Sequence, residues 1–274
     1  MTVYPCAKIN LGLNIVGVRP DGYHDLETVF YPVAVCDELT IEKADSDITD
    51  GAPGCTLAVD SNYDIGNAQD NLVVRAYQTL ASSYPLPPVS IRLHKRIPVQ
   101  AGMGGGSSDC SFTLKALDTM FNLGIGDDRL RRYAASLGAD CPFFIAPKPC
   151  YAEGTGDQMT PLSIDLSPYT IAIVKPQVAV STRQAFAGVT VRKPERCCRD
   201  IVMQPVETWR GSLRNDFEAS VFAIHPELDT LKSRLYDLGA LYASMTGSGS
   251  ALYGIFREVP DVASAFPECF TAIV

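Results

Sequence analysis

The stretch Ala101-Gly102-Met103-Gly104-Gly105-Gly106-Ser107-Ser108-Asp109 is a cluster of glycines that leads into two hydroxyls and a carboxylate. Glycine has no Cβ atom and readily adopts positive φ, so a ligand can approach the backbone closely here. Ser107, Ser108 and Asp109 are typical helix-starting residues, and apolar residues at 114, 117 and 121 follow with helical spacing before Gly124. A glycine loop joined to a helix N-terminus is typical of a phosphate site, because unpaired N–H groups and the positive dipole end point the same way. The stretch therefore predicts a phosphate-binding loop and a helix that ends near Gly124.

This loop differs from two common phosphate motifs. No Lys-Ser or Lys-Thr follows the glycines, so the GxxxxGK[ST] pattern is absent, and the spacing also fails the GxGxxG pattern. The alternative is a tight strand-to-helix turn whose glycines are structural. So many glycines together with hydroxyls favour the phosphate site.

The composition of the 274-residue chain is that of a folded protein with room for two domains, since 46% of its residues are hydrophobic. The net charge of −8 argues against broad nucleic-acid binding. The sequence has no stretch typical of a membrane span, a signal peptide or a transit peptide, so we expect a cytoplasmic protein that has no membrane or nucleic-acid partner.

Nine cysteines are spaced irregularly and form no CxxC metal pattern, which indicates reduced thiols. The neighbouring Cys197 and Cys198 lie beside Arg196 and Arg199, where a lowered thiol pKa is conceivable. We nevertheless expect no functional role for this pair.

The first half of the chain contains several recognisable elements. Strict alternation predicts a strand over residues 7–16, with Lys8 and Asn10 on its polar face, and residues 19–24 predict a turn. For a single strand, a polar face of this kind is also consistent with simple exposure to solvent. Further strands are expected at 29–35, 38–42 and 89–93, a helix at 71–80, and a loop-rich acidic segment at 44–70.

The second half has a mixed pattern. A helix is expected at 128–137 with Gly138 as its cap, and Pro142 then leaves Asp140 at an abrupt junction. Residues 151–157 predict a glycine-bearing turn, and 170–174 a strand; a helix opens at Pro226 and is closed by Gly239. Strands at 240–245 and 251–256 flank a loop at 246–250. This order of elements favours an α+β fold, and no repeat is present.

Three separated pieces of the chain together resemble the GHMP kinases, the family of galactokinase, homoserine kinase and mevalonate kinase. The pieces are Lys8 and Asn10 on the first strand, the glycine loop, and the loop Thr246–Ser250. Residues 98–109 match the family's P-x-x-x-G-L-G-S/G-S-S motif, with Met103 in place of the usual leucine. The segments at 7–11, 21–24, 137–142 and 152–154 are similar to one branch of the family, whose acceptor alcohol carries a cytidine diphosphate.

The resemblance implies a two-domain α+β fold, the GHMP kinase fold. An N-terminal ATP-binding domain would span residues 1–155, and a C-terminal ferredoxin-like domain would span 156–274. The active site would lie in the cleft between these domains.

The resemblance also implies the roles of the residues that bind ATP and carry out transfer. Asp140 would accept the proton of the substrate hydroxyl, and Lys8 would hold Asp140 ionised and polarise the attacking oxygen. Ser107 or Ser108 would lie near Mg²⁺. Lys95 and Asn71 stand where the family frames the adenine; solvated side chains are the alternative for both. The residues expected to bind ATP are Asn71, Lys95, Pro98, Ala101, Gly102, Met103, Gly104, Gly105, Gly106, Ser107, Ser108, Gly247, Ser248 and Gly249.

For the acceptor, the resemblance implies a small-molecule cytidyl diphosphate substrate. Tyr23 and Phe186 would enclose the cytosine, and His24 would hydrogen-bond its polar edge, since aromatic faces stack on any base and hydrogen bonds select among bases. Asn10 and Thr182 would contact the remaining hydroxyls or the diphosphate.

The activity that the resemblance implies is that of a cytoplasmic kinase in the bacterial non-mevalonate route to isoprenoid precursors. The alternatives are a GHMP kinase for another alcohol, such as homoserine or mevalonate, and a non-catalytic nucleotide-binding member of the family.

Overall fold

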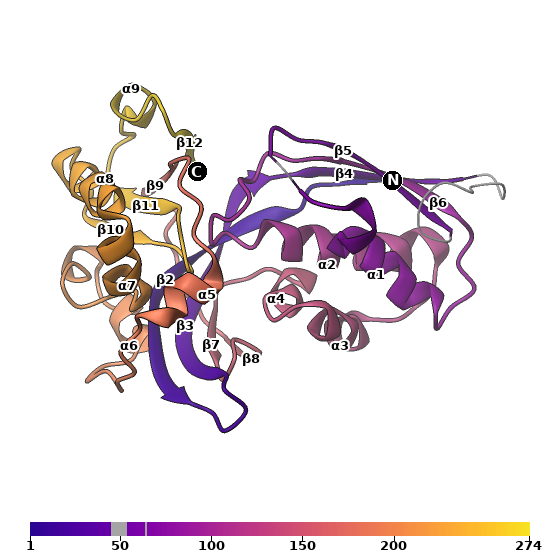
Figure 1. Cartoon of the computed structure of the whole chain (residues 1–274), viewed down its shortest axis with the longest axis horizontal. Helices are drawn as coiled ribbons and strands as arrows, with labels where there is room; N and C mark the ends of the chain where they lie inside the picture. Colours follow the sequence, from indigo (N-terminus) through magenta and orange to yellow (C-terminus); the bar gives the residue numbers. More distant parts are fainter. Residues whose placement is uncertain (45–53, 64) are drawn as a thin grey trace. The chain divides into compact units, whose positions relative to one another are not determined.

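The computed structural model describes residues 1–44, 54–63 and 65–274, and these divide into two compact units that interleave along the chain (Figure 1). Unit 1 consists of Met1–Ala7, Ala34–Val99 and Gly104–Pro147. Unit 2 consists of Lys8–Val33, Gln100–Met103 and Lys148–Val274. The domain boundary expected between residues 155 and 156 stays a prediction.

Unit 1 is a four-stranded sheet with helices on one face (Figure 1). The order is β1-β4-β6-β5, with β5 parallel to β6 and the other pairs antiparallel. The strands and helices are β1 (Thr2–Val3), β4 (Glu38–Lys43), β5 (Cys55–Asp60), β6 (Val89–His94), α1 (Leu72–Ala81), α2 (Gly105–Phe121), α3 (Asp127–Leu137), α4 (Cys141–Ile145) and the 3₁₀ turn η1 (Ala68–Asp70).

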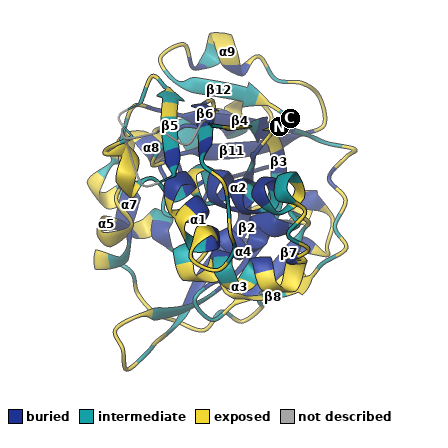
Figure 2. Cartoon of the chain, turned by 90° about the vertical axis from the view of Figure 1, so that its right-hand side faces the viewer, coloured by how far each residue is buried: buried dark blue, intermediate teal, exposed yellow. Residues whose placement is uncertain are grey.

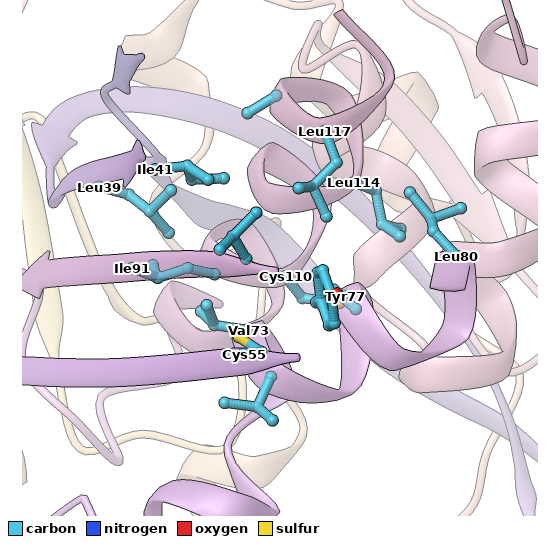
Figure 3. Close-up of a cluster of buried hydrophobic side chains, with 14 of the residues drawn as sticks. Leu39, Ile41, Cys55, Val73, Tyr77, Leu80, Ile91, Cys110, Leu114 and Leu117 are labelled. Atoms are coloured by element: carbon cyan, nitrogen blue, oxygen red, sulfur yellow. The ribbon is translucent and has the colours of Figure 1, made fainter. Parts of the chain in front are cut away.

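The core of unit 1 follows from the alternation of β6 and the periodicity of α2. Val89, Ile91 and Leu93 are buried while Arg92 and His94 between and after them are exposed, so one face of the strand points at the helices. Leu114 and Leu117 of α2 pack into the same cluster as these strand residues (Figure 3). In Figure 2, α2 is mostly dark blue while the outer sides of α1 and α3 are yellow, as expected for a central helix between two amphipathic ones.

Unit 2 contains two sheets. The first has the order β2-β3-β7-β8, and the second is antiparallel with the order β10-β11-β9-β12. Their strands are β2 (Cys6–Val18), β3 (His24–Cys36), β7 (Cys150–Glu153), β8 (Gln158–Pro161), β9 (Thr170–Lys175), β10 (Tyr242–Met245), β11 (Leu252–Phe256) and β12 (Phe270–Ile273). The helices are α5 (Thr182–Ala187), α6 (Cys198–Val202), α7 (Phe217–Ile224), α8 (Pro226–Asp237), α9 (Val262–Ala265) and the 3₁₀ turn η2 (Val206–Thr208).

The second sheet confirms the ferredoxin-like expectation. A strand, helices, two hairpin-connected strands, a further helix and a last strand follow one another from β9 to β12, and β9 lies between β11 and β12. The helix α8 packs on β10 and β11 (Figure 1). Its leucines Leu228 and Leu235 are buried in the core of the unit, whereas Leu238, the C-cap residue that follows the helix, is exposed.

Several expected elements differ from the structure. The helix α2 starts at Gly105, inside the glycine cluster, and ends at Phe121. Its C-cap residue is Asn122, which adopts φ 51° in the left-handed region. Pro142 opens the short helix α4, for which Asp140 is the preceding N-cap residue. The segment expected to be a loop at 44–70 contains β5, which is the parallel edge strand; residues 45–53 and 64 of that segment lie outside the described residues.

Candidate active site

The predicted catalytic lysine lies at the centre of a buried hydrogen-bond network in unit 2. Lys8 is 3% exposed, and its Nζ atom donates to Asn10 Oδ1 at 2.6 Å and to the carbonyl oxygen of Gly102 at 2.9 Å. The same ammonium lies 5.2 Å from the ring centre of Phe30. Asn10 Nδ2 donates in turn to Thr28 Oγ1 at 2.9 Å. The strand β2 therefore presents a fixed cation beside the entrance of the glycine loop.

Thr246 joins the second predicted loop to this network. Its hydroxyl accepts the backbone N–H of Asn10 at 3.0 Å and lies 3.2 Å from both Asn10 Oδ1 and the Gly102 carbonyl oxygen. Asn215 supports the loop from behind, since its Nδ2 donates to the carbonyl oxygens of Met245 and Gly247 at 2.8 Å each. Thr246 and Asn215 were not predicted from the sequence. The threonine stands at the edge of a predicted motif, which is a usable signal, whereas nothing local marks Asn215.

Gly102 is required where these segments meet. It adopts φ +71°, and a Cβ atom there would lie 2.0 Å from the carbonyl oxygen of Thr246. Gly247 packs against it from the other side with φ +53°. Backbone bonds from Ser250 to Gln100 and from Ala251 to Ala101, 3.2 Å each, complete the junction. The sequence predicted that a ligand approaches these glycines, whereas the group that approaches Gly102 is the backbone of the 246–250 loop.

The remaining glycines and both serines belong to unit 1, where they form the N-terminus of α2. Gly104 precedes the helix with φ 72°, and Gly105, Gly106 and Ser107 occupy its first turn. The N–H groups of a first helical turn have no partners within the helix. Ser108 is fully buried, and its Oγ atom has no hydrogen-bond partner among the described residues. An orphaned buried hydroxyl at a helix N-terminus is suited to accept a ligand.

A buried group of three charges anchors this helix in unit 1. The Lys95 ammonium forms ion pairs with Asp37 and, at 2.7 Å, with Asp109 Oδ2 of the first turns of α2. All three side chains are at most 5% exposed. Asp37 Oδ1 also accepts the backbone N–H groups of Arg96 at 2.5 Å and Ile97 at 2.8 Å. The cluster thus connects the end of β6, which leads to Pro98, with the start of α2.

Burial and the neighbouring charges shift the pKa values of Asp109 and Lys95 in this cluster. Burial raises the pKa of Asp109 to about 7, although the Lys95 ammonium opposes that rise. Burial also acts against the charge on Lys95, but the attraction of Asp109 and Asp37 exceeds it and raises the lysine pKa. Asp37 accepts two backbone donors in addition to Lys95, while Asp109 Oδ1 has no partner among the described residues. The Asp109 carboxyl therefore takes up a proton more readily than a solvent-exposed aspartate does.

This geometry affects the expectation for Lys95, whose ammonium was predicted to frame the adenine of ATP. In the structure that ammonium is bound by two carboxylates, so its first role is to hold unit 1 together. Asp37, which was not predicted, follows β3 and precedes β4 with no local sequence signal.

Two further predicted residues begin helices in unit 1. Asp140 is partly buried and precedes α4, where its carbonyl oxygen accepts the N–H of Phe143 at 3.3 Å. Asn71 caps α1, and its side chain accepts the N–H of Val73 at 2.9 Å. The catalytic role of Asp140 and the adenine contact of Asn71 stay predictions.

The predicted base-binding residues Tyr23, His24 and Phe186 all belong to unit 2. His24, at the start of β3, stacks on Phe186 with ring centres 4.7 Å apart and an interplanar angle of 29°. Phe186 also packs edge-to-face with Phe217, with ring centres 4.8 Å apart and an interplanar angle of 85°. Tyr23 is 67% exposed in the turn before His24. The structure therefore brings His24 and Phe186 into contact, although they are 162 positions apart in the sequence (186 − 24 = 162).

A local sequence motif explains where α5, the helix that carries Phe186, begins. Ser181 and Gln184 form a capping box, in which each side chain bonds the backbone N–H of the other residue, so α5 starts at Thr182. Thr182 is exposed on the first turn of that helix, and its predicted contact with the acceptor stays untested.

The neighbouring cysteines 197 and 198 lie at the start of α6. Burial raises the pKa of both thiols, so the lowered pKa conceivable from the flanking arginines is absent. The Cys198 N–H donates to Glu27 Oε1 at 3.1 Å, and Tyr151 OH donates to Glu27 Oε2 at 2.9 Å.

Across the described residues, no group of three or more His, Cys, Asp or Glu is arranged to hold a metal ion. None of the helices there is long and apolar enough to span a bilayer.

Comparison with known proteins agrees with this arrangement. The family model for the GHMP kinases N terminal domain matches residues 71–147, and the model for the GHMP kinases C terminal matches residues 206–272. The 4-diphosphocytidyl-2-C-methyl-D-erythritol kinase of Bacteroides thetaiotaomicron is 49% identical over 94% of this chain and 92% of its own length. The corresponding kinase of Porphyromonas gingivalis is 46% identical over 98% of this chain and 97% of its own.

Solved structures give the same result. A crystal structure of 4-(cytidine 5'-diphospho)-2C-methyl-D-erythritol kinase superposes with a TM-score of 0.81 at 30% identity, over 100% of this chain and 98% of the other. A homoserine kinase from Cytophaga hutchinsonii superposes with a TM-score of 0.66 at 14% identity, covering 98% of this chain and 94% of its own, which is a likeness of fold alone. The chain therefore belongs to the GHMP kinases, and it is a small-molecule kinase with the two-domain α+β fold of that family.

Proposed function

We propose that this kinase transfers the γ-phosphoryl group of ATP to the 2-hydroxyl of 4-diphosphocytidyl-2-C-methyl-D-erythritol. The products are the 2-phosphate and ADP, and the step belongs to the non-mevalonate route to isoprenoid precursors. The observation that carries the choice of substrate is the stacked pair of His24 and Phe186 beside the exposed ring of Tyr23. Flat aromatic faces suit a nucleobase, and homoserine and mevalonate have none. The high identity to full-length kinases for this substrate supports the same choice.

The transfer chemistry is assigned to Lys8 and Asp140. Asp140 takes the proton from the acceptor hydroxyl, whose oxygen forms the new bond to the γ-phosphorus while the bond to the β,γ-bridging oxygen breaks and ADP leaves. Lys8 supplies fixed positive charge for this step, and its hydrogen bonds to Asn10 and Gly102 hold the ammonium in place. Asn10 is held in place by hydrogen bonds with Lys8 and Thr28. Its proposed role is to contact the hydroxyls or the diphosphate of the acceptor.

The phosphates of ATP are assigned to the glycine loop and the start of α2. The first-turn N–H groups of this 17-residue helix and the orphaned Ser108 hydroxyl fit an anionic ligand. The hydroxyls of Ser107 and Ser108 are oxygen ligands of the kind that Mg²⁺ prefers. When bound, Mg²⁺ supplies neutralising charge to the phosphoryl oxygens.

The cytoplasmic location expected for this protein stays a prediction.

Replacing Tyr23 by alanine tests the base-binding assignment. We expect the KM for the cytidyl substrate to rise about 5- to 150-fold, because stacking one base on an aromatic ring contributes about 1–3 kcal/mol. The KM for ATP should change less than about twofold. Steady-state kinetics with each substrate varied in turn measure both values, and Tyr4→Ala, at an equally exposed tyrosine of unit 1, is the control. An equal rise of both KM values would remove Tyr23 from the acceptor site.

A further inference from the structure

Unit 2 contains a cavity that the proposed function does not use. It has a volume of about 490 Å³ and is lined by the segment before α6, by Ile201 of that helix and by the turn before α7. None of the residues assigned to ATP, to the acceptor or to catalysis lines it. This size is within the range of small-molecule sites in proteins. We call it the Arg192 cavity.

The Arg192 cavity is basic in an acidic protein. Four cationic side chains line it, those of Arg192, Lys193, Arg196 and Arg214, against the two carboxylates of Glu195 and Asp216. The local balance is therefore +2 (4 − 2), while the whole chain carries −8.

The four cations form no close ion pair among the described residues, although the Asp216 carboxylate lies near enough to interact with Arg192 and Arg214. None of them forms an ion pair within the described part of the chain, whereas other arginines there, such as Arg92 and Arg257, are paired with glutamates. Asp216 lines the same cavity, but its Oδ2 accepts the backbone N–H of Ile15 at 2.9 Å. An excess of positive charge gathered in a concavity raises the local concentration of anions.

The backbone holds two of these arginines against one rigid strand. The N–H of Arg192 donates to the carbonyl oxygen of Ile15 at 3.1 Å, and the carbonyl oxygen of Arg214 accepts the N–H of Leu13 at 2.8 Å. Both bonds lie along the edge of β2 that no other strand of its sheet covers. Asp216 adds a third bond on this edge, because its N–H donates to the Leu13 carbonyl oxygen at 2.8 Å. Arg192 and Arg214 are thus attached two residues apart along one strand, although the side chains themselves are exposed.

We propose that the Arg192 cavity binds a small phosphorylated anion, through its phosphate or diphosphate group, at a site separate from the ATP and acceptor sites. A guanidinium is always charged and presents paired N–H donors that match phosphate oxygens two at a time. Lys193 adds a point charge, and the hydroxyl of Ser212, which also lines the cavity, adds a neutral donor. The cavity has room for such a group with a small organic portion attached.

The test uses inorganic pyrophosphate as the probe and isothermal titration of the full chain with its ATP site filled by a non-hydrolysable ATP analogue. We expect one pyrophosphate to bind, and its Kd to rise at least tenfold in the double variant Arg192→Gln, Arg214→Gln. The matched control is Arg92→Gln, Arg257→Gln, which removes two exposed arginines outside the cavity and should change the Kd less than twofold. The kcat for the kinase reaction should change less than twofold in both double variants.

Two further arms make the test decisive. Arg192→Lys, Arg214→Lys keeps the charges but loses the paired donors, so its Kd should lie between those of the wild type and the glutamine variant. Malonate, a dianion without phosphorus, should bind at least tenfold more weakly than pyrophosphate. The proposal is wrong if pyrophosphate does not bind once the ATP site is filled, if the cavity and control variants bind alike, or if malonate binds as tightly. Binding of an acidic peptide in preference to pyrophosphate would overturn it as well.

Discussion

Replacing Asp140 by asparagine is expected to lower kcat by about 10²- to 10⁴-fold, the usual contribution of a positioned general base. Asparagine keeps the size and shape of the side chain and is accepted before a helix, so α4 should still form. Because the variant loses only the ability to take the hydroxyl proton, the KM for ATP should change less than about threefold. Steady-state kinetics at pH 7–8 measure both quantities.

The control for this variant is Asp127→Asn, which changes another aspartate at the start of a helix, the exposed first residue of α3. Its kcat should remain within twofold of the wild type. If Asp140→Asn also turned over at a near-normal rate, Asp140 would have no part in proton transfer, and charge stabilisation by Lys8 and the loop would have to account for the rate.

Replacing Lys95 by methionine is expected to lower the free energy of unfolding by about 3–5 kcal/mol at pH 7, as is typical when one partner of a buried ion pair is removed. The substitution leaves Asp37 and Asp109 buried without the cation that joins them. Urea unfolding followed by circular dichroism measures the loss. The control is Lys115→Met, because the Lys115 ammonium in α2 bonds the backbone carbonyl oxygen of Ile145, and about 1 kcal/mol is expected there.

The loss in Lys95→Met should depend on pH in a defined direction. The pKa of Asp109 in the folded protein is about 7, above the unfolded value of about 3.9. A proton on this carboxyl therefore favours folding, fully below about pH 4 and progressively less as the pH rises through 7. Without the ammonium the folded pKa rises further, so the stability deficit of the variant should shrink between pH 7 and pH 5. A deficit that stays constant or grows on acidification, or one equal to that of Lys115→Met, would contradict the role given to the three charges.

The sequence predicted the helices and strands whose apolar residues recur at regular spacing. Residues 7–16 lie within β2 as predicted, although both faces of the strand are buried there and its polar side chains do not face solvent. The apolar spacing at 128–137 is that of α3. The strand β5 was missed because five of its six residues are only partly buried or exposed, which leaves little alternation to detect. The start of α2 was placed two residues late because glycines have a low helix propensity, yet Gly105 and Gly106 form the first residues of the helix.

The residues of the candidate site were predictable where they lie within motifs, and their supports were not. Lys8, Asn10 and Gly102 were all expected, and the structure joins them by direct hydrogen bonds. Asp37 meets Lys95 across 58 residues, and Asn215 reaches the 246–250 loop across 32. Contacts over such separations depend on the folded topology, and a single sequence with no alignment carries no record of them.

The most direct measurement of the central claim is phosphoryl transfer by the purified chain with ATP, Mg²⁺ and a panel of acceptor alcohols, followed by ³¹P resonance. With 4-diphosphocytidyl-2-C-methyl-D-erythritol we expect a new phosphomonoester signal, equimolar ADP and a kcat/KM at least about 100-fold higher than for homoserine or mevalonate, because only the cytidyl substrate offers a base to the aromatic pair. The same reaction with Asp140→Asn should be nearly silent. Preferential phosphorylation of homoserine or mevalonate, or binding of ATP without transfer to any acceptor, would contradict the account.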